Sequence, residues 1–144
     1  MTFRSQSGSQ TIEFAMVILP LMMVVLVVFE VVRLMWVTMV FESAVMSAVR
    51  SVRTMVPSAI VEEQIRTHIA EFPLLTLENI QVDTPRYADS VASLASQQWV
   101  SAQYAVVAEY HIHYQFRFLL AAKLTQAFPA LTTLSRTVMV SYDG

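Results

Sequence analysis

The residues with the clearest potential for chemistry stand near the N-terminus, where a single carboxylate precedes a long apolar stretch. Glu13 follows Gly8 by five positions, and residues 14–29 contain no charged side chain. A carboxylate at a helix N-terminus complements the helix dipole, typically by about 0.3 to 1 kcal/mol. A charge in a low-dielectric setting is also costly to leave unmatched, so Glu13 is a candidate to pair with a positive group. The residues alone leave both roles open.

A pair of opposite charges marks the far end of the apolar stretch. Glu30 and Arg33 are three residues apart, which places them on one face of a helix where they can form an interfacial ion pair. Both side chains can extend to the membrane–water boundary, so a helix of roughly 20 residues, enough to cross a bilayer, tolerates them. No secretory-type cleavage site follows, and the helix is expected to stay on the mature chain. Pro20 predicts a bend within it.

Three side chains of types that bind metals stand at every second position further along the chain. Glu109, His111 and His113 would share one face of a strand, where metal binding is conceivable. No fourth ligand is fixed by the spacing, so a hydrated outer sheet face is the favoured interpretation. No serine stands in a motif that indicates activation by a base. We therefore expect no metal site, no cofactor and no catalytic residue.

Composition excludes several classes of function. The 144-residue chain has a net charge of −2 and no cysteine, and its two glycines are Gly8 and Gly144. Scattered basic residues provide no electrostatic footprint for nucleic acid. Disulfides, thiolate zinc sites and cysteine catalysis are impossible. Glycine-rich phosphate loops and nucleophile elbows cannot be built either.

Hydrophobic periodicity predicts the elements that position these residues. Four valines continue the first helix on one stripe until Pro57 ends it: Val45, Val49, Val52 and Val56. The result is a spine of about 45 residues, or about 65 Å. Small residues between Ser43 and Ser51 would either allow another helix to approach closely or form an ordinary helix surface.

The rest of the chain predicts a short helix and a small sheet. Ser58 would cap a helix that closes near Phe72 and Pro73 and buries Val61, Ile65 and Ile69. Residues 77–82 form a weak strand, 83–98 an irregular loop, 119–128 a brief helix and 134–142 a final strand. Residues 104–116 alternate between apolar and polar side chains. Such a strand belongs to an antiparallel sheet covered on one side, and the outer half of the long helix is the expected cover. The predicted fold class is α+β.

The N-terminal residues resemble a known family. They are similar to the TadE/TadF-like pseudopilins of the tight-adherence (Tad, or Flp) pilus machinery, a branch of the type IV pilus systems. The similarity is carried by Ser7-Gly8-Ser9-Gln10-Thr11-Ile12-Glu13-Phe14-Ala15, by Ile18-Leu19-Pro20-Leu21, by Glu30-Val31-Val32-Arg33-Leu34 and by residues 44–53. Weaker similarities lie at residues 110–118 and 135–139.

The resemblance implies proteolytic processing. An aspartyl prepilin peptidase would cleave after Gly8, making Ser9 the new N-terminus and Glu13 the fifth mature residue. A glycine flanked by serines resists helix formation, so we expect this segment to stay extended and accessible. The new amine would lie near Glu13, whose carboxylate would set the axial register between subunits. Phe14, where major Flp pilins have tyrosine, and the additional domain indicate a pseudopilin or minor pilin.

The implied organisation is a pilin-like one in three parts. Residues 1–8 form a cytoplasmic prepilin leader, 9–56 the transmembrane and extended spine, and 57–144 an extracytoplasmic α+β domain. Arg4 would hold the leader in the cytoplasm, with the chain crossing the bacterial inner membrane once. Other pilins or pseudopilins and the Tad membrane platform are the expected partners, and the protein would support pilus assembly, adherence and biofilm formation. An uncleaved single-pass scaffold of a secretion complex is the alternative, and a membrane-tethered enzyme or metal-binding domain is a third.

Overall fold

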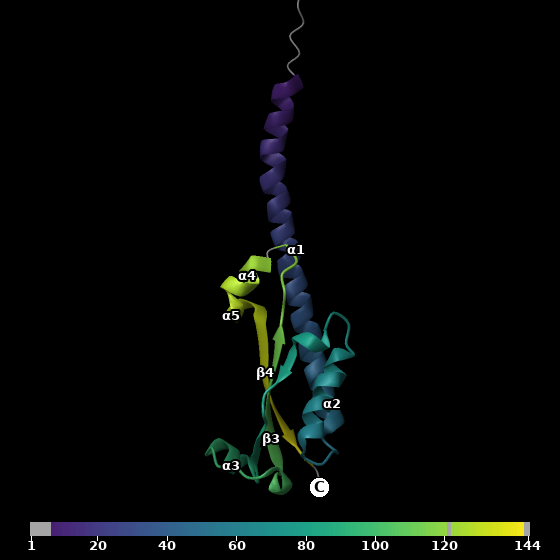
Figure 1. The fold of residues 1–144 in the computed structure, drawn as a ribbon, viewed down its shortest axis with the longest axis vertical. Coiled ribbons are helices and arrows are strands. Elements are labelled where there is room, and N and C mark those ends of the chain that lie inside the picture. The colour runs from purple at the N-terminus through teal and green to yellow at the C-terminus, as the bar shows by residue number, and fades with distance from the viewer. Residues whose placement is uncertain (1–6, 121, 143–144) are drawn as a thin grey trace, which may run out of the picture.

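One long helix organises the computed structural model, which describes residues 7–120 and 122–142. Helix α1 (Ser7–Val52) has 46 residues, or about 69 Å at 1.5 Å per residue. Its first half projects away from the remainder of the molecule (Figure 1). The helix ends a few residues earlier than the valine stripe predicted, and Val56 is exposed. A turn follows in which Met55 N–H donates to the Val52 carbonyl, just before Pro57.

Helix α2 (Ala59–Ala70) packs against the outer part of α1. Its predicted stripe is confirmed, because Val61, Ile65 and Ile69 are all buried. Small residues of α1 favour close packing: Ala44 and Ala48 are fully buried in the core that the two helices share with the sheet. Ser47 Oγ lies 3.0 Å from His68 Nε2 and links α1 to α2. Ser58 occupies the N-cap position as predicted, but its side chain makes no capping hydrogen bond.

The sheet is built around its longest central strand. Strand β3 (Val107–Gln115) pairs antiparallel along its whole length with β4 (Thr133–Ser141). On its other edge β3 pairs with two short strands in succession, β1 (Ile80–Val82) and β2 (Arg86–Ala88). The predicted weak strand is therefore real only over its last three residues, because η1 (Leu77–Asn79) is a 3₁₀ turn.

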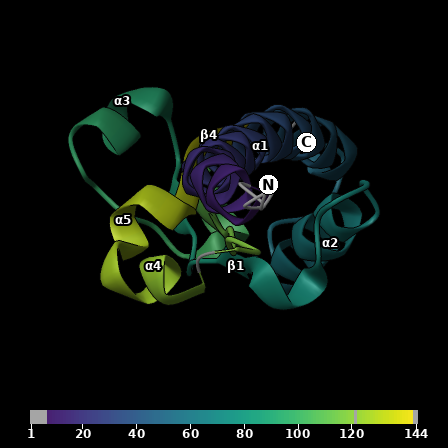
Figure 2. The ribbon, with the colours of Figure 1, turned by 90° about the horizontal axis from the view of Figure 1, so that it is seen from above.

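The core lies between this sheet and the two helices. Alternate residues of β3 and its continuation point into it, namely Ala108, Tyr110, Ile112, Tyr114 and Phe116, and they pack with Val37, Phe41 and Val45 of α1. Figure 2 shows α1 and α2 on one side and the shorter helices on the other. The predicted α+β architecture, a long apolar helix whose outer half packs on a small antiparallel sheet, is confirmed. The outer half of α1 was predicted to cover the sheet, and it shares this role with α2, which contributes to the same core.

The segment predicted as an irregular loop is more ordered than expected. It contains β2 and α3 (Val91–Ala95), and Ser90 caps α3 by accepting a hydrogen bond from Ser93 N–H at 3.1 Å. Leu94 packs with Ala88 and Val107 and covers one end of the sheet's second face. Elements of three to five residues carry too little periodicity to be predicted. The expected apolar face is also too long, because Tyr104 and Val106 are exposed and η2 (Ala102–Tyr104) is a 3₁₀ turn.

Two short helices replace the predicted brief helix between the last strands. They are α4 (Ala122–Ala127) and α5 (Pro129–Thr132). Pro129 begins α5 because proline is suited to the first turn of a helix, where its missing N–H is not needed. Phe116 N–H donates to the carbonyl of buried Thr132 at 2.7 Å, and this hydrogen bond joins the two ends of the connection. Figure 1 places α4 at the end of the sheet nearest the projecting half of α1.

Candidate functional site

The N-terminal site residues lie on the projecting end of α1. Gly8 and Ser9 belong to its first turn, so the extended conformation expected around the glycine is wrong for this structure. A chain end with no packed neighbour is free to propagate helix, and the apolar residues that follow favour it. Glu13 and Phe14 are exposed one turn further on. Residues 1–6, including Arg4, lie outside the described residues.

The stretch that follows, residues 10–29, is called here the inner half of α1. Its apolar side chains are exposed around the whole helix: Leu19, Met23, Val24, Val27 and Val28 are between 56% and 65% exposed. Pro20 lies within a helix that continues without a break, and the predicted bend there stays a prediction. Of the described residues, only those of α1 form a helix long and apolar enough to cross a membrane.

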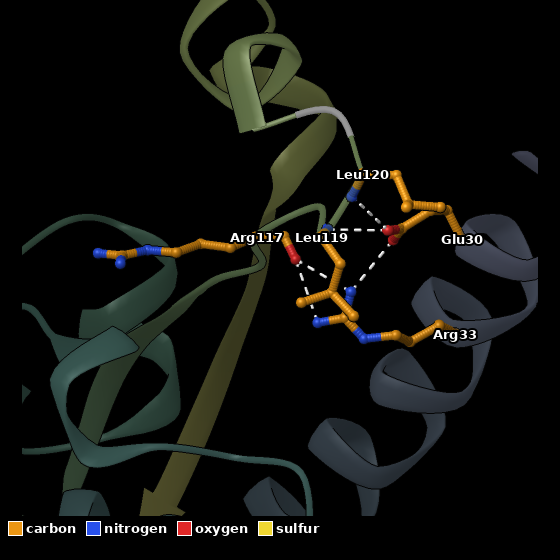
Figure 3. Close-up of polar contacts among 5 residues, drawn as sticks. All are labelled: Glu30, Arg33, Arg117, Leu119 and Leu120. Atoms are coloured by element: carbon orange, nitrogen blue, oxygen red, sulfur yellow. Dashed lines mark hydrogen bonds and ion pairs between the residues drawn. The ribbon is translucent and has the colours of Figure 1, made fainter. Parts of the chain in front are cut away.

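Glu30 stands at the end of the inner half and joins it to the sheet domain. Its carboxylate is almost completely buried and accepts the backbone N–H groups of Leu119 at 2.8 Å and Leu120 at 3.0 Å, both on Oε1. These two residues follow the end of β3. Figure 3 shows the carboxylate facing the loop rather than open solvent. The domain covers this carboxylate, and the expected position of Glu30 at the membrane boundary stays a prediction.

Arg33 completes this contact from the next turn of α1. Its Nη1 lies 3.1 Å from Glu30 Oε2, so the two side chains form an ion pair at the spacing of three residues. The same guanidinium donates two hydrogen bonds to the Arg117 carbonyl, at 3.2 and 3.1 Å, and lies over the Phe116 ring at 4.6 Å from its centroid. The two charges and three backbone groups of residues 117, 119 and 120 form what we call the clasp (Figure 3).

The clasp can hold the sheet domain at one height on the spine. Hydrogen bonds that involve a charged group contribute roughly 1.5 to 3 kcal/mol each, about twice a neutral one. Three backbone groups satisfied in this way fix a loop whose Phe118 also packs against the core. Sequence reasoning identified Glu30 and Arg33 but not their partners. Backbone groups have no sequence signal, so only the fold could reveal residues 117, 119 and 120.

The histidine face lies away from the clasp. His111 Nε2 is 2.7 Å from Glu109 Oε1, and its Nδ1 is 2.9 Å from Thr137 Oγ1. His113 instead pairs with Asp83, at 3.1 Å. Among the described residues, no group of three metal-type ligands converges. These imidazoles bind neighbouring side chains on a half-exposed sheet face.

The fold and these contacts define a class of protein: a helical spine with one membrane-capable end and a small antiparallel sheet domain clasped to its other half. Residues 8–50 match the family model described as TadE-like protein. This match confirms the resemblance predicted from the first third of the chain, and it covers nearly all of α1. The match covers the apolar helix but not the sheet domain. No curated protein and no solved structure matches the chain. The similarity to TadE-like proteins therefore belongs to residues 8–50, and it points to the Tad pilus system as the setting in which to look for a function.

Proposed function

We propose that the protein is a pseudopilin or minor pilin of a Tad pilus. It enters the bacterial inner membrane with its N-terminus in the cytoplasm, is cleaved by a prepilin peptidase after Gly8 and assembles with pilin-like partners through α1. In this way it supports pilus assembly, adherence and biofilm formation. The observation that carries the proposal is the exposure of apolar side chains around the entire inner half of α1. Such a surface is stable only in lipid or against other apolar helices.

The helical first turn bears on how cleavage would occur. A protease acts on an extended peptide, so Ser7 to Gln10 must unwind before the bond after Gly8 can be cut. The first four N–H groups of a helix have no intrahelical partner, and a terminal glycine and serine weaken that turn further. Unwinding one terminal turn costs little compared with opening any part of the helix beyond it. The proposed cleavage site therefore lies where unwinding α1 costs the least free energy.

The mature N-terminus provides the direct test. Intact mass and terminal peptide sequencing of membrane-extracted protein, with and without the host's prepilin peptidases, should give a start at Ser9 only when the peptidase is present. A matched Gly8→Leu variant should remain full length. A retained or merely methionine-trimmed start in the presence of active peptidase would refute the proposal and favour the uncleaved scaffold.

Glu13 has a separate role in the proposal. After cleavage, the amine of Ser9 and the Glu13 carboxylate of the same or a neighbouring subunit would pair in the membrane and set the axial register. Glu13→Gln should therefore lower recovery of the protein with assembled pilus components while leaving cleavage unchanged. Glu63→Gln, an exposed carboxylate on α2, is the matched control. Equal recovery of the two variants would exclude the register role.

A further inference from the structure

A second apolar surface lies beside the clasp. Four side chains follow the end of β3 and are unusually exposed for large hydrophobic residues: Leu119 at 67%, Leu120 at 54%, Phe128 at 54% and Leu131 at 69%. We call them the membrane-side rim. They belong to the connection that carries α4 and α5, at the end of the sheet nearest the inner half of α1 (Figure 1). Their position requires an explanation, because the sheet's core does not use them.

The rim is continuous with the lipid-type surface of α1. A groove of about 360 Å³ is lined by Met23, Leu26 and Val27 of the inner half, by Glu30 and Val31 just beyond it, and by Phe118 and Leu120. Met23 stands seven residues before Glu30, or about 10 Å further along the helix axis. The loop therefore extends past the clasp and along a part of α1 that contains no charge. If α1 crosses a membrane, the rim reaches the same depth as the end of the span.

The backbone of this loop is already suited to a dry environment. Peptide groups at a hydrocarbon boundary must be hydrogen-bonded within the protein, since water is not there to satisfy them. Glu30 accepts the N–H groups of Leu119 and Leu120, and Arg33 binds the Arg117 carbonyl. Three polar groups of the loop that would otherwise need water are thus satisfied. The clasp therefore lowers the cost of placing these three backbone groups near lipid.

The charges around the rim suit a lipid headgroup surface. Between Glu109 and Asp143 the sequence contains no acidic residue, whereas Arg117 just before the rim and Lys123 within its range are both exposed. Basic side chains at an apolar edge bind the phosphates of lipid headgroups and keep their stems in the apolar layer. Trp36, 63% exposed one turn beyond Arg33, is of the type that accumulates at membrane interfaces.

We propose that the membrane-side rim is a second membrane-contacting surface, which seats in the headgroup region beside α1 and inserts Leu119, Leu120, Phe128 and Leu131 among the upper acyl chains. The inference rests on the proposed membrane crossing of α1. Two attachments at different points prevent the sheet domain from pivoting about the spine. The groove below Glu30 then holds part of a lipid acyl chain, and the clasp sets the depth of the domain.

The absence of cysteine allows a direct measurement of depth. The full chain is reconstituted in phosphatidylcholine–phosphatidylglycerol vesicles as single-cysteine variants labelled with a fluorophore: Val24→Cys in the middle of the span, Leu120→Cys and Leu131→Cys in the rim, and Val91→Cys on α3. Val91 is 65% exposed and therefore matches Leu131 in exposure, but it lies at the opposite end of the sheet. Quenching by lipids brominated at shallow or deep chain positions is then compared with quenching by aqueous iodide.

The expected result is strong quenching of the rim probes by shallow bromines, of the Val24 probe by deep bromines, and of the Val91 probe by iodide alone. Rim probes that behave like the Val91 probe, while the Val24 probe is quenched by lipid, overturn the inference and leave the membrane crossing intact. If the Val24 probe also escapes lipid quenching, the proposed crossing itself fails. Rim probes shielded from both quenchers, with shielding lost on dilution in lipid, would show that a second copy covers the rim and also overturn the inference.

Discussion

The two halves of α1 share one backbone and similar apolar content, yet they meet opposite environments. In the inner half, residues 10–29, large side chains such as Phe29 are exposed. In the outer half, residues 34–52, Phe41, Val45 and Val52 are almost completely buried against α2 and the sheet. The sequence difference is small: the outer half alternates its apolar residues with Ser43, Ala44, Ser47, Ala48 and Arg50. Apolar content makes a helix, but the distribution of small and polar residues decides what packs on it.

The boundary between the halves coincides with the clasp. Glu30 and Arg33 are the first charges after residue 13, and both bind the loop that follows β3. Charges that a membrane helix tolerates at its end therefore serve here as the attachment point of the domain. A buried carboxylate of this kind is stabilising only while all its partners are present. The clasp is accordingly expected to be sensitive to substitution of either charge.

The largest expected difference between the halves comes from a matched pair of phenylalanines. Phe41→Ala should lower the free energy of unfolding of the domain by about 3 to 5 kcal/mol, because the ring is 1% exposed and its removal leaves a cavity. Phe29→Ala should leave it nearly unchanged, since the ring is 56% exposed. Denaturant unfolding of the full chain in detergent, followed by near-ultraviolet circular dichroism, measures both. Similar losses for the two variants would contradict the comparison.

Substituting two carboxylates of α1 tests whether the clasp stabilises the boundary between the halves. Glu30→Ala leaves two loop N–H groups unpaired and should cost roughly 2 to 3 kcal/mol of domain stability. Glu42→Ala removes an exposed ion pair with Arg136 and should cost less than about 1 kcal/mol. Hydrogen exchange of the Leu119 and Leu120 amides supplies a local readout, which should accelerate only in the first variant. Protection of these amides that survives Glu30→Ala would show that the clasp does not hold the loop.

Alkaline pH should lower the stability of the sheet domain that packs on the outer half of α1. Burial raises the pKa of the Tyr110 hydroxyl, whose oxygen lies 2.5 Å from that of Tyr142, and burial likewise raises the pKa of Tyr142. An unfolded tyrosine ionises near pH 10, while the folded hydroxyl keeps its proton above that value. Stability is therefore fully present below about pH 10 and is lost as the pH rises further. Tyr110→Phe should reduce this loss, whereas Tyr104→Phe, at an exposed position, should not.

The smallest effect on the domain is expected within the inner half. Pro20→Ala restores a backbone N–H donor to α1 and should straighten any bend there. Spin labels at residues 12 and 27 should report the change in distance across the proline. The free energy of domain unfolding should stay within about 0.5 kcal/mol of the parent, because Pro20 is exposed and does not belong to the buried core. A larger shift would mean that the two halves are coupled through the helix.

Much of the architecture was predictable because it depends on periodicity. The spine, the stripe of Val61, Ile65 and Ile69, and the alternating face around Tyr110 and Ile112 follow from spacings of 3.6 and 2 residues. The short elements could not be predicted in this way, since β1, β2 and α3 exist mainly through pairing with β3 or packing on it. The conformation at Gly8 was also missed, because local preference there was outweighed by continuation of the long apolar helix.

The sequence by itself determined a single apolar helix with a charged end, a TadE-like N-terminal pattern and a sheet with one buried face, because all of these are properties of residue type and spacing. Only the tertiary structure decided where Glu30 and Arg33 find their partners. Their acceptors and donors are backbone groups nearly 90 residues away in sequence. Every residue possesses such groups, and so their choice depends on where β3 ends above the helix rather than on any side chain.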